Sequence, residues 1–158
     1  NGSRSTMHEH AKVLYTIDPS LSLLYYVIAG SIELGDLFEY EQIAWRDPLR
    51  RPGMKIIIDL TLVSEMNYEL ADIQRMIGLN ANLLAQGLPL ERTAAIGRKA
   101  YDITAGQIVS DRAQLAVPID MGVFLTLREA VEWLELGHVY DQIAAIQARL
   151  WRQIGAEE

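Results

Sequence analysis

The sequence contains no cysteine, and this absence excludes several kinds of chemistry. A chain without cysteine has no disulfide bonds, no thiolate metal ligands and no cysteine nucleophile. It fits a reducing compartment, and we expect a cytoplasmic protein. Histidine is also scarce, with three residues. Two of them, His8 and His10, lie near the start of the chain. Because a closed zinc site needs about four ligands, we predict no metal site there.

Long apolar runs are absent as well. The longest runs, such as residues 23–29, have the length of buried strands. They fall short of the ~20 residues that a helix needs to cross a bilayer, so we predict no membrane span. Residues 1–6 are small and polar and precede Met7. That pattern is typical of residues left by an expression vector before the natural start, Met7. We interpret residues 1–10 as this added segment together with a flexible N-terminus.

The motifs of common enzyme classes are missing. The phosphate-binding patterns G-x-x-x-x-G-K-S/T and G-x-G-x-x-G do not occur, so we predict no nucleotide cofactor. There is no G-x-S-x-G nucleophile elbow, and His138 has no evident partner for a catalytic triad. Asp59 ends an apolar segment and is followed by Glu65, Glu69 and Asp72. We interpret Asp59 as a hydrogen-bonded structural carboxylate with solvated neighbours. The sequence therefore predicts a protein that is not an enzyme and that needs no cofactor.

Acidic residues outnumber basic ones, 21 to 14, which gives a formal net charge of −7. Nucleic acids carry dense negative charge, so we predict no nucleic-acid partner. One short basic stretch holds Arg46, Arg50 and Arg51, interrupted by Asp47 and Pro48. We interpret it as a solvated loop.

The pattern that is present is an alternation of apolar and amphipathic segments along 158 residues, a length that suits one domain. Strands are predicted over residues 13–15, 23–29, 55–60, 93–97 and 122–125, and helices over 36–45, 67–84, 101–114, 127–137 and 139–154. The first two strands are close enough to form a hairpin. The later strands alternate with helices, which predicts a mostly parallel sheet. We therefore expect an α/β fold with a central sheet of about five strands, an antiparallel edge hairpin and flanking helices.

Three segments follow one another along the chain: Y-V-I-A-G-S-I at residues 26–32, I-I-I-D-L-T at 56–61, and V-F-L-T-L-R-E-A-V-E-W-L at 123–134. In this order they resemble the SpoIIAA-like branch of the STAS domains, the superfamily of sulfate transporters and anti-sigma-factor antagonists. The resemblance covers about residues 13–136. It implies a SpoIIAA-like domain over residues 11–137, an extra helical extension over 138–158, and a bacterial regulatory protein that acts through protein binding.

The chain departs from this superfamily at one functional position. Phosphorylated antagonists usually carry Asp-Ser-Ser-Gly at the start of the long helix, where the first serine accepts the phosphate. Alignment on Asp59 places Asn67, Tyr68, Glu69 and Leu70 there. We therefore predict that this chain lacks the serine phospho-switch. Glu69 either imitates a permanent negative charge or is a solvated acid favoured by the helix dipole, and both interpretations stay open.

These observations favour a non-catalytic interaction or regulatory module that binds a protein partner, or itself, through a sheet edge or a helix face. The alternative is a small apolar-ligand or lipid-binding domain with a cavity between the first helix and the sheet. The SpoIIAA-like fold is similar to that of lipid-carrying CRAL-TRIO domains, although fold analogy alone is an association. The candidate lining residues are Tyr26, Phe38, Tyr40, Trp45 and Met54. Core packing would explain the same residues.

The end of the chain carries one apolar stripe formed by Val139, Ile143, Ile146, Leu150 and Ile154. Burying each large aliphatic side chain is worth roughly 1.5–3 kcal/mol, so this stripe must be covered. It lies either on its own domain or on a second copy. We expect a homodimer with Val139, Ile143, Ile146 and Leu150 at the interface, and packing on the chain's own sheet is the alternative.

Overall fold

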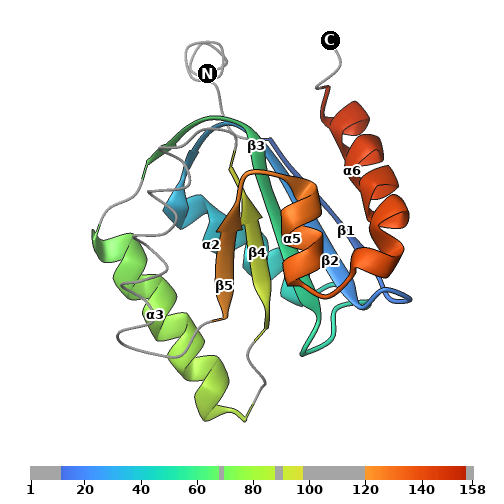
Figure 1. Cartoon of the computed structure of the whole chain (residues 1–158). Helices are drawn as coiled ribbons and strands as arrows, with labels where there is room; N and C mark the ends of the chain where they lie inside the picture. The colour runs from blue at the N-terminus through green and yellow to red at the C-terminus, as the bar shows by residue number, and fades with distance from the viewer. Residues whose placement is uncertain (1–11, 68–69, 88–90, 98–119, 156–158) are drawn as a thin grey trace.

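The computed structural model describes residues 12–67, 70–87, 91–97 and 120–155. Five strands form one sheet with helices on both faces (Figure 1). The strands are β1 Lys12–Asp18, β2 Leu23–Glu33, β3 Lys55–Asn67, β4 Thr93–Ile96 and β5 Met121–Phe124. The helices are α2 Leu34–Trp45, α3 Leu70–Ala85, α5 Leu127–Trp133, the short 3-10 helix η1 Gly137–Val139, and α6 Tyr140–Ile154. The helix predicted over residues 101–114 lies outside the described residues.

The strands lie in the order β1-β2-β3-β4-β5. β1 pairs antiparallel with β2, with Tyr15 opposite Tyr26. The pairs β2–β3, β3–β4 and β4–β5 are parallel. The predicted mixed sheet with an antiparallel edge hairpin is therefore confirmed. No helix among the residues that the structure describes is long and apolar enough to cross a membrane.

β2 and β3 are longer than the sequence predicts, because they continue to pair beyond the ends of their apolar runs. Ser31 lies opposite Glu65, and Glu33 lies opposite Asn67. Register shifts interrupt the ladder on either side of Ala29 and Gly30. In this part of the sheet few positions are buried and polar side chains are mixed with apolar ones, so no continuous apolar run marks the strands.

Consecutive residues of a strand point to opposite faces of the sheet, and β2 shows this along its length. One face packs against α5 and α6 and includes Leu23, Tyr25, Val27 and Ile57. The other face packs against α2 and includes Leu24, Tyr26, Ile28 and Ile56. The two faces therefore form separate cores, one on each side of the central strands.

α6 packs on the chain's own sheet. The prediction that its apolar stripe forms the exposed interface of a homodimer is therefore wrong. Within a single chain, Ile143 is 0% exposed and Leu150 is 2% exposed. Ile146 and Ile154 are also buried, and Val139 packs beside them half-buried. These side chains share one core with the face of β2 that carries Tyr25. The sheet itself supplies the cover that the apolar stripe requires.

α5 begins at the residue that the sequence predicts, and α2 does not. Thr126 caps α5: its hydroxyl oxygen accepts the backbone N–H of Glu129 at 3.1 Å and donates to Glu129 Oε1 at 3.0 Å. The bond from the Glu129 N–H to the Thr126 hydroxyl is the N-cap half of a capping box. α2 instead begins at Leu34, two residues before Asp36, and its N-cap Glu33 makes no side-chain capping bond. The helix follows directly from the extended β2, so Asp36 lies inside its first turn.

Candidate functional site

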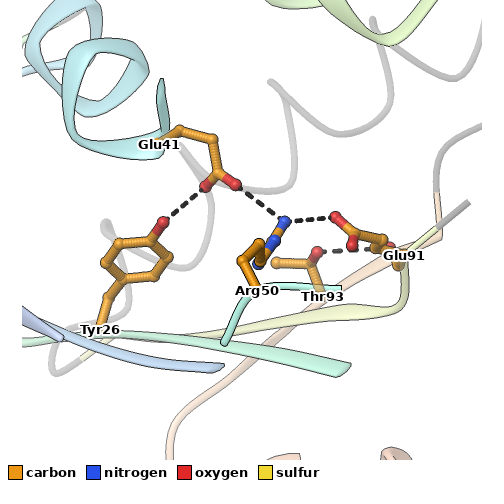
Figure 2. Close-up of polar contacts among 5 residues, drawn as sticks. All are labelled: Tyr26, Glu41, Arg50, Glu91 and Thr93. Carbon is orange, nitrogen blue, oxygen red and sulfur yellow. Dashed lines mark hydrogen bonds and ion pairs between the residues drawn. The ribbon is translucent and has the colours of Figure 1, made fainter. Parts of the chain in front are cut away.

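A cluster of four polar residues lies under α2, at the end of the sheet where the parallel strands begin (Figure 2). We call Tyr26, Glu41, Arg50 and Glu91 the Arg50 cluster. The Arg50 side chain is 0% exposed, and its Nη2 donates to Glu41 Oε1 at 3.2 Å and to Glu91 Oε1 at 2.7 Å. The Tyr26 hydroxyl donates to Glu41 Oε2 at 3.0 Å. The interpretation of Arg50 as part of a solvated loop is therefore wrong.

The Arg50 cluster joins three separate parts of the chain. Glu41 comes from α2, Arg50 from the loop between α2 and β3, and Glu91 from the segment just before β4. The ring of Trp45 covers the guanidinium of Arg50, whose Cζ lies 4.1 Å from the ring centroid. Two charged hydrogen bonds and one cation–π contact thus satisfy much of a charge that would be costly to bury alone.

Local geometry turns Arg50 inward. After α2 ends, the Asp47 amide donates to the Ala44 carbonyl at 3.1 Å, and the Arg50 amide donates to the Asp47 carbonyl at 2.9 Å. The Asp47 carboxylate also accepts the Leu49 amide at 3.0 Å and the Tyr15 hydroxyl at 2.9 Å. Asp47 therefore fixes two successive turns and ties them to β1.

The charges of the Arg50 cluster do not balance, because two carboxylates share one guanidinium. Burial raises the pKa of Glu91 to about 7, an effect that nearby Glu41 increases and Arg50 opposes. Within the described part of the chain, Glu91 Oε2 and the Nε and Nη1 atoms of Arg50 have no hydrogen-bond partner. Arg50 and a backbone hydrogen bond from Gly53 stabilise the charged form, but burial outweighs them, so the pKa stays raised.

The other two groups of the cluster respond to the same surroundings. Burial raises the pKa of Glu41, while Arg50 and the hydrogen bond from Tyr26 lower it. Burial also raises the pKa of Tyr26, and the charge of Glu41 adds to the effect. The Tyr26 hydroxyl therefore stays a donor at neutral pH and holds α2 to β2.

The outer side of the same segment is exposed and partly apolar. Ile43 is 49% exposed and Leu49 is 46% exposed, and Arg46 and Arg51 beside them are exposed as well. We call Ile43, Arg46, Leu49 and Arg51 the shoulder. Its residues alternate with inward-facing ones, of which Ala44 is 0% exposed. The buried cluster thus fixes the backbone that presents the shoulder to solvent.

A second buried polar site lies on the opposite face of the sheet, around Asp59. Asp59 is 0% exposed, and its Oδ2 accepts the Tyr25 hydroxyl at 2.8 Å. The same oxygen accepts Gln147 Nε2 at 3.0 Å and Trp151 Nε1 at 3.1 Å, both from α6. Asp59 Oδ1 accepts the Thr61 amide at 3.0 Å. The predicted burial and hydrogen bonding of Asp59 are confirmed.

The predicted ligand-lining residues lie mostly in the packed core. Tyr26 is 4% exposed and Met54 is 2% exposed, and both belong to the core under α2. Trp45 covers Arg50, and Tyr40 is half-buried on α2. The side chain of Phe38 lies outside the described part of the structure. Packing and the Arg50 cluster account for the described residues, and a ligand role for the set stays a prediction.

The segment that replaces the serine motif lies at the junction between β3 and α3. Asn67 is the last residue of β3 and is exposed, and α3 begins at Leu70. Tyr68 and Glu69 lie outside the described residues. Asn67, where the sequence predicts the start of the long helix, is thus part of β3. Across the described ranges, no group of three or more His, Cys, Asp or Glu side chains is placed to hold a metal ion.

No protein-family model matches the chain, and neither does any curated protein. Among solved structures, the chain is similar to an uncharacterised protein of the DUF3478 family from Shewanella loihica PV-4, described as having a SpoIIAA-like fold. The two chains are 19% identical, the match covers 80% of this chain and 96% of the other, and the TM-score is 0.50. The chain therefore has the SpoIIAA-like fold that the sequence resemblance implied.

Proposed function

We propose that this SpoIIAA-like domain is a non-catalytic interaction module that binds a protein partner through the shoulder. One observation carries the proposal. Among the described residues, three large apolar side chains stay about half exposed: Ile43, Leu49 and Leu125. Two of these three lie on the one segment 43–51, where they alternate along the sequence with exposed Arg46 and Arg51. The buried centre of a protein interface is more apolar than the rest of the surface, and arginine is enriched at interfaces.

The Arg50 cluster supports this proposal because it makes the shoulder rigid before any partner binds. Arg50 anchors the loop to Glu41 and Glu91, and Asp47 closes the turns on either side of Leu49. A loop that is already ordered loses less conformational entropy on binding. The buried charges therefore serve the exposed surface, since they hold its backbone in one conformation.

Two buried acids, Asp59 and Glu41, support the non-catalytic part of the proposal. A general base needs a lone pair within reach of a substrate. Asp59 is buried and accepts four hydrogen bonds from its own chain. Both oxygens of Glu41 are also engaged, by Arg50 and by Tyr26. The replacement of the serine motif by Asn67, Tyr68 and Glu69 favours binding that does not depend on phosphorylation at that position.

Site-specific photo-crosslinking in the cells that make the protein tests the proposal. The photoreactive residue p-benzoylphenylalanine is placed at position 49, and for the control at position 148, where Ala148 is exposed on α6. We expect one adduct of defined mass from position 49 and none of that mass from position 148. Adding Ile43→Asp to the position-49 chain should abolish the adduct. The proposal is overturned if position 49 gives no adduct, or if the adduct persists with Ile43→Asp.

A further inference from the structure

We infer that the shoulder binds a second copy of this chain along α5, so that copies associate head to tail. This inference rests on the proposed function of the shoulder and names its partner. The surface on the second copy consists of Leu125, Glu129 and Glu132, which we call the α5 face. Leu125 is 55% exposed, and both glutamates are exposed.

The shoulder and the α5 face are complementary in charge and alike in apolar content. They hold between them all three exposed large apolar side chains of the described residues. On the shoulder these side chains are neighbours of Arg46 and Arg51 in the sequence. On the α5 face, Leu125 comes just before the helix cap Thr126, and Glu129 and Glu132 follow three residues apart on the helix. A contact between the two surfaces brings apolar groups together and places arginines against glutamates, which favours this pairing over others.

The same charges disfavour a symmetric dimer. Two shoulders facing each other would oppose arginine with arginine, and two α5 faces would oppose glutamate with glutamate. Like charges across an interface are penalised, so the complementary, head-to-tail contact is the better one. The one basic residue of α5, Arg128, is engaged elsewhere, because its Cζ lies 3.9 Å from the centroid of the Tyr140 ring.

The shoulder and the α5 face cannot bind each other within one chain, because they lie on opposite sides of the sheet. α2 packs on one face and α5 on the other, and Figure 1 shows α5 in front of the sheet and α2 behind it. Each surface is also held by its own local structure. The Arg50 cluster holds the shoulder, and the Thr126 cap holds the first turn of α5. Head-to-tail contacts between such surfaces build rings or open assemblies.

Two variants, each with one surface blocked, test the inference by sedimentation. Ile43→Ser/Leu49→Ser blocks the shoulder, and Leu125→Ser/Glu132→Lys blocks the α5 face while leaving Glu129 in the cap. The native chain should show a mass that rises with protein concentration above the 17.8 kDa of one chain and falls with added salt. Each variant alone should remain a monomer at the concentrations where the native chain associates.

The mixture of the two variants gives the decisive result. Each still has one intact surface, and the intact surfaces are complementary, so an equimolar mixture should form a 1:1 dimer and nothing larger. The control Arg152→Ser, an exposed change on α6, should associate like the native chain. Association of either variant alone as strongly as the native chain overturns the inference. A native chain that stays monomeric also overturns the inference. If position 49 still crosslinks to a different protein in that case, the proposed function stands and only the inference of self-association fails.

Discussion

Replacing Glu91 by glutamine should make the stability of the protein less dependent on pH. Burial raises the pKa of Glu91 from its ordinary value of 4.5 to about 7 in the folded chain. Between these two values the folded chain holds a proton that the unfolded chain has released. The free energy of unfolding therefore falls as pH rises from about 4.5 through about 7, and it levels off above the folded pKa.

The structure sets the size of this effect. The difference between about 7 and 4.5, at about 1.36 kcal/mol for each pKa unit, gives about 3 kcal/mol. The Glu91 side chain is 12% exposed, so water screens this energy only slightly. The pKa of Glu41 is raised as well, and its contribution has the same sign, but it is present in both proteins that are compared.

Urea denaturation at pH 5, 6, 7 and 8 measures the effect. Over this range the native chain should lose about 2 kcal/mol more of its free energy of unfolding than Glu91→Gln, because most of the titration window lies inside it. Glu39→Gln, an exposed change on α2, should follow the native chain. Parallel curves for native and Glu91→Gln chains would refute the reasoning, since Glu91 would then titrate alike in the folded and unfolded states.

Three other changes and one measurement test the remaining predictions. Thr126→Ala removes the cap of α5 and should lower the free energy of unfolding by about 1 kcal/mol in urea denaturation; no change would mean that the cap contributes nothing. Asp59→Asn places an amide among donors and should cost about 2 kcal/mol or more by the same assay, while crosslinking from position 49 persists. A chain that ends at Gly137 lacks α6 and exposes the core beneath it. We expect this chain to be insoluble, or to give the circular dichroism spectrum of an unfolded protein, and not to be a folded monomer. Ser64, the serine nearest the replaced motif, is exposed in β3, and mass spectrometry of protein from its own cells should find no stoichiometric phosphate there.

The architecture of the sheet could be predicted because it follows from the spacing of the apolar segments and from the order of strands and helices along the chain. The short spacing between residues 13–15 and 23–29 indicated the hairpin, and the alternation with helices indicated the parallel strands. The ends of β2 and β3 could not be predicted in the same way. Residues 61–67 mix apolar and polar side chains, and their strand conformation comes from pairing with β2, which local sequence does not encode.

The Arg50 cluster could not be predicted from the sequence, because its members are far apart along the chain. Arg50 meets Glu91 at a separation of 41 residues. Locally, Arg50 belongs to a run of charges and a proline, a composition typical of solvated loops. Nothing in that run indicates burial. The apolar stripe of α6 was visible, but a stripe predicts only that a face is covered, and the covering surface proved to be the chain's own sheet.

The pair Tyr25 and Tyr26 shows what the sequence could have indicated about the polar core. Neighbours in a two-sided strand point into opposite cores, and a buried tyrosine hydroxyl needs a partner in each. Those partners are Asp59 on the α6 side and Glu41 on the α2 side. The donors to Asp59 are all neutral groups, whereas Glu41 shares a buried cation with a second carboxylate. The proton that Glu91 binds near pH 7 is therefore taken up on the α2 side of the sheet, the side that also carries the shoulder.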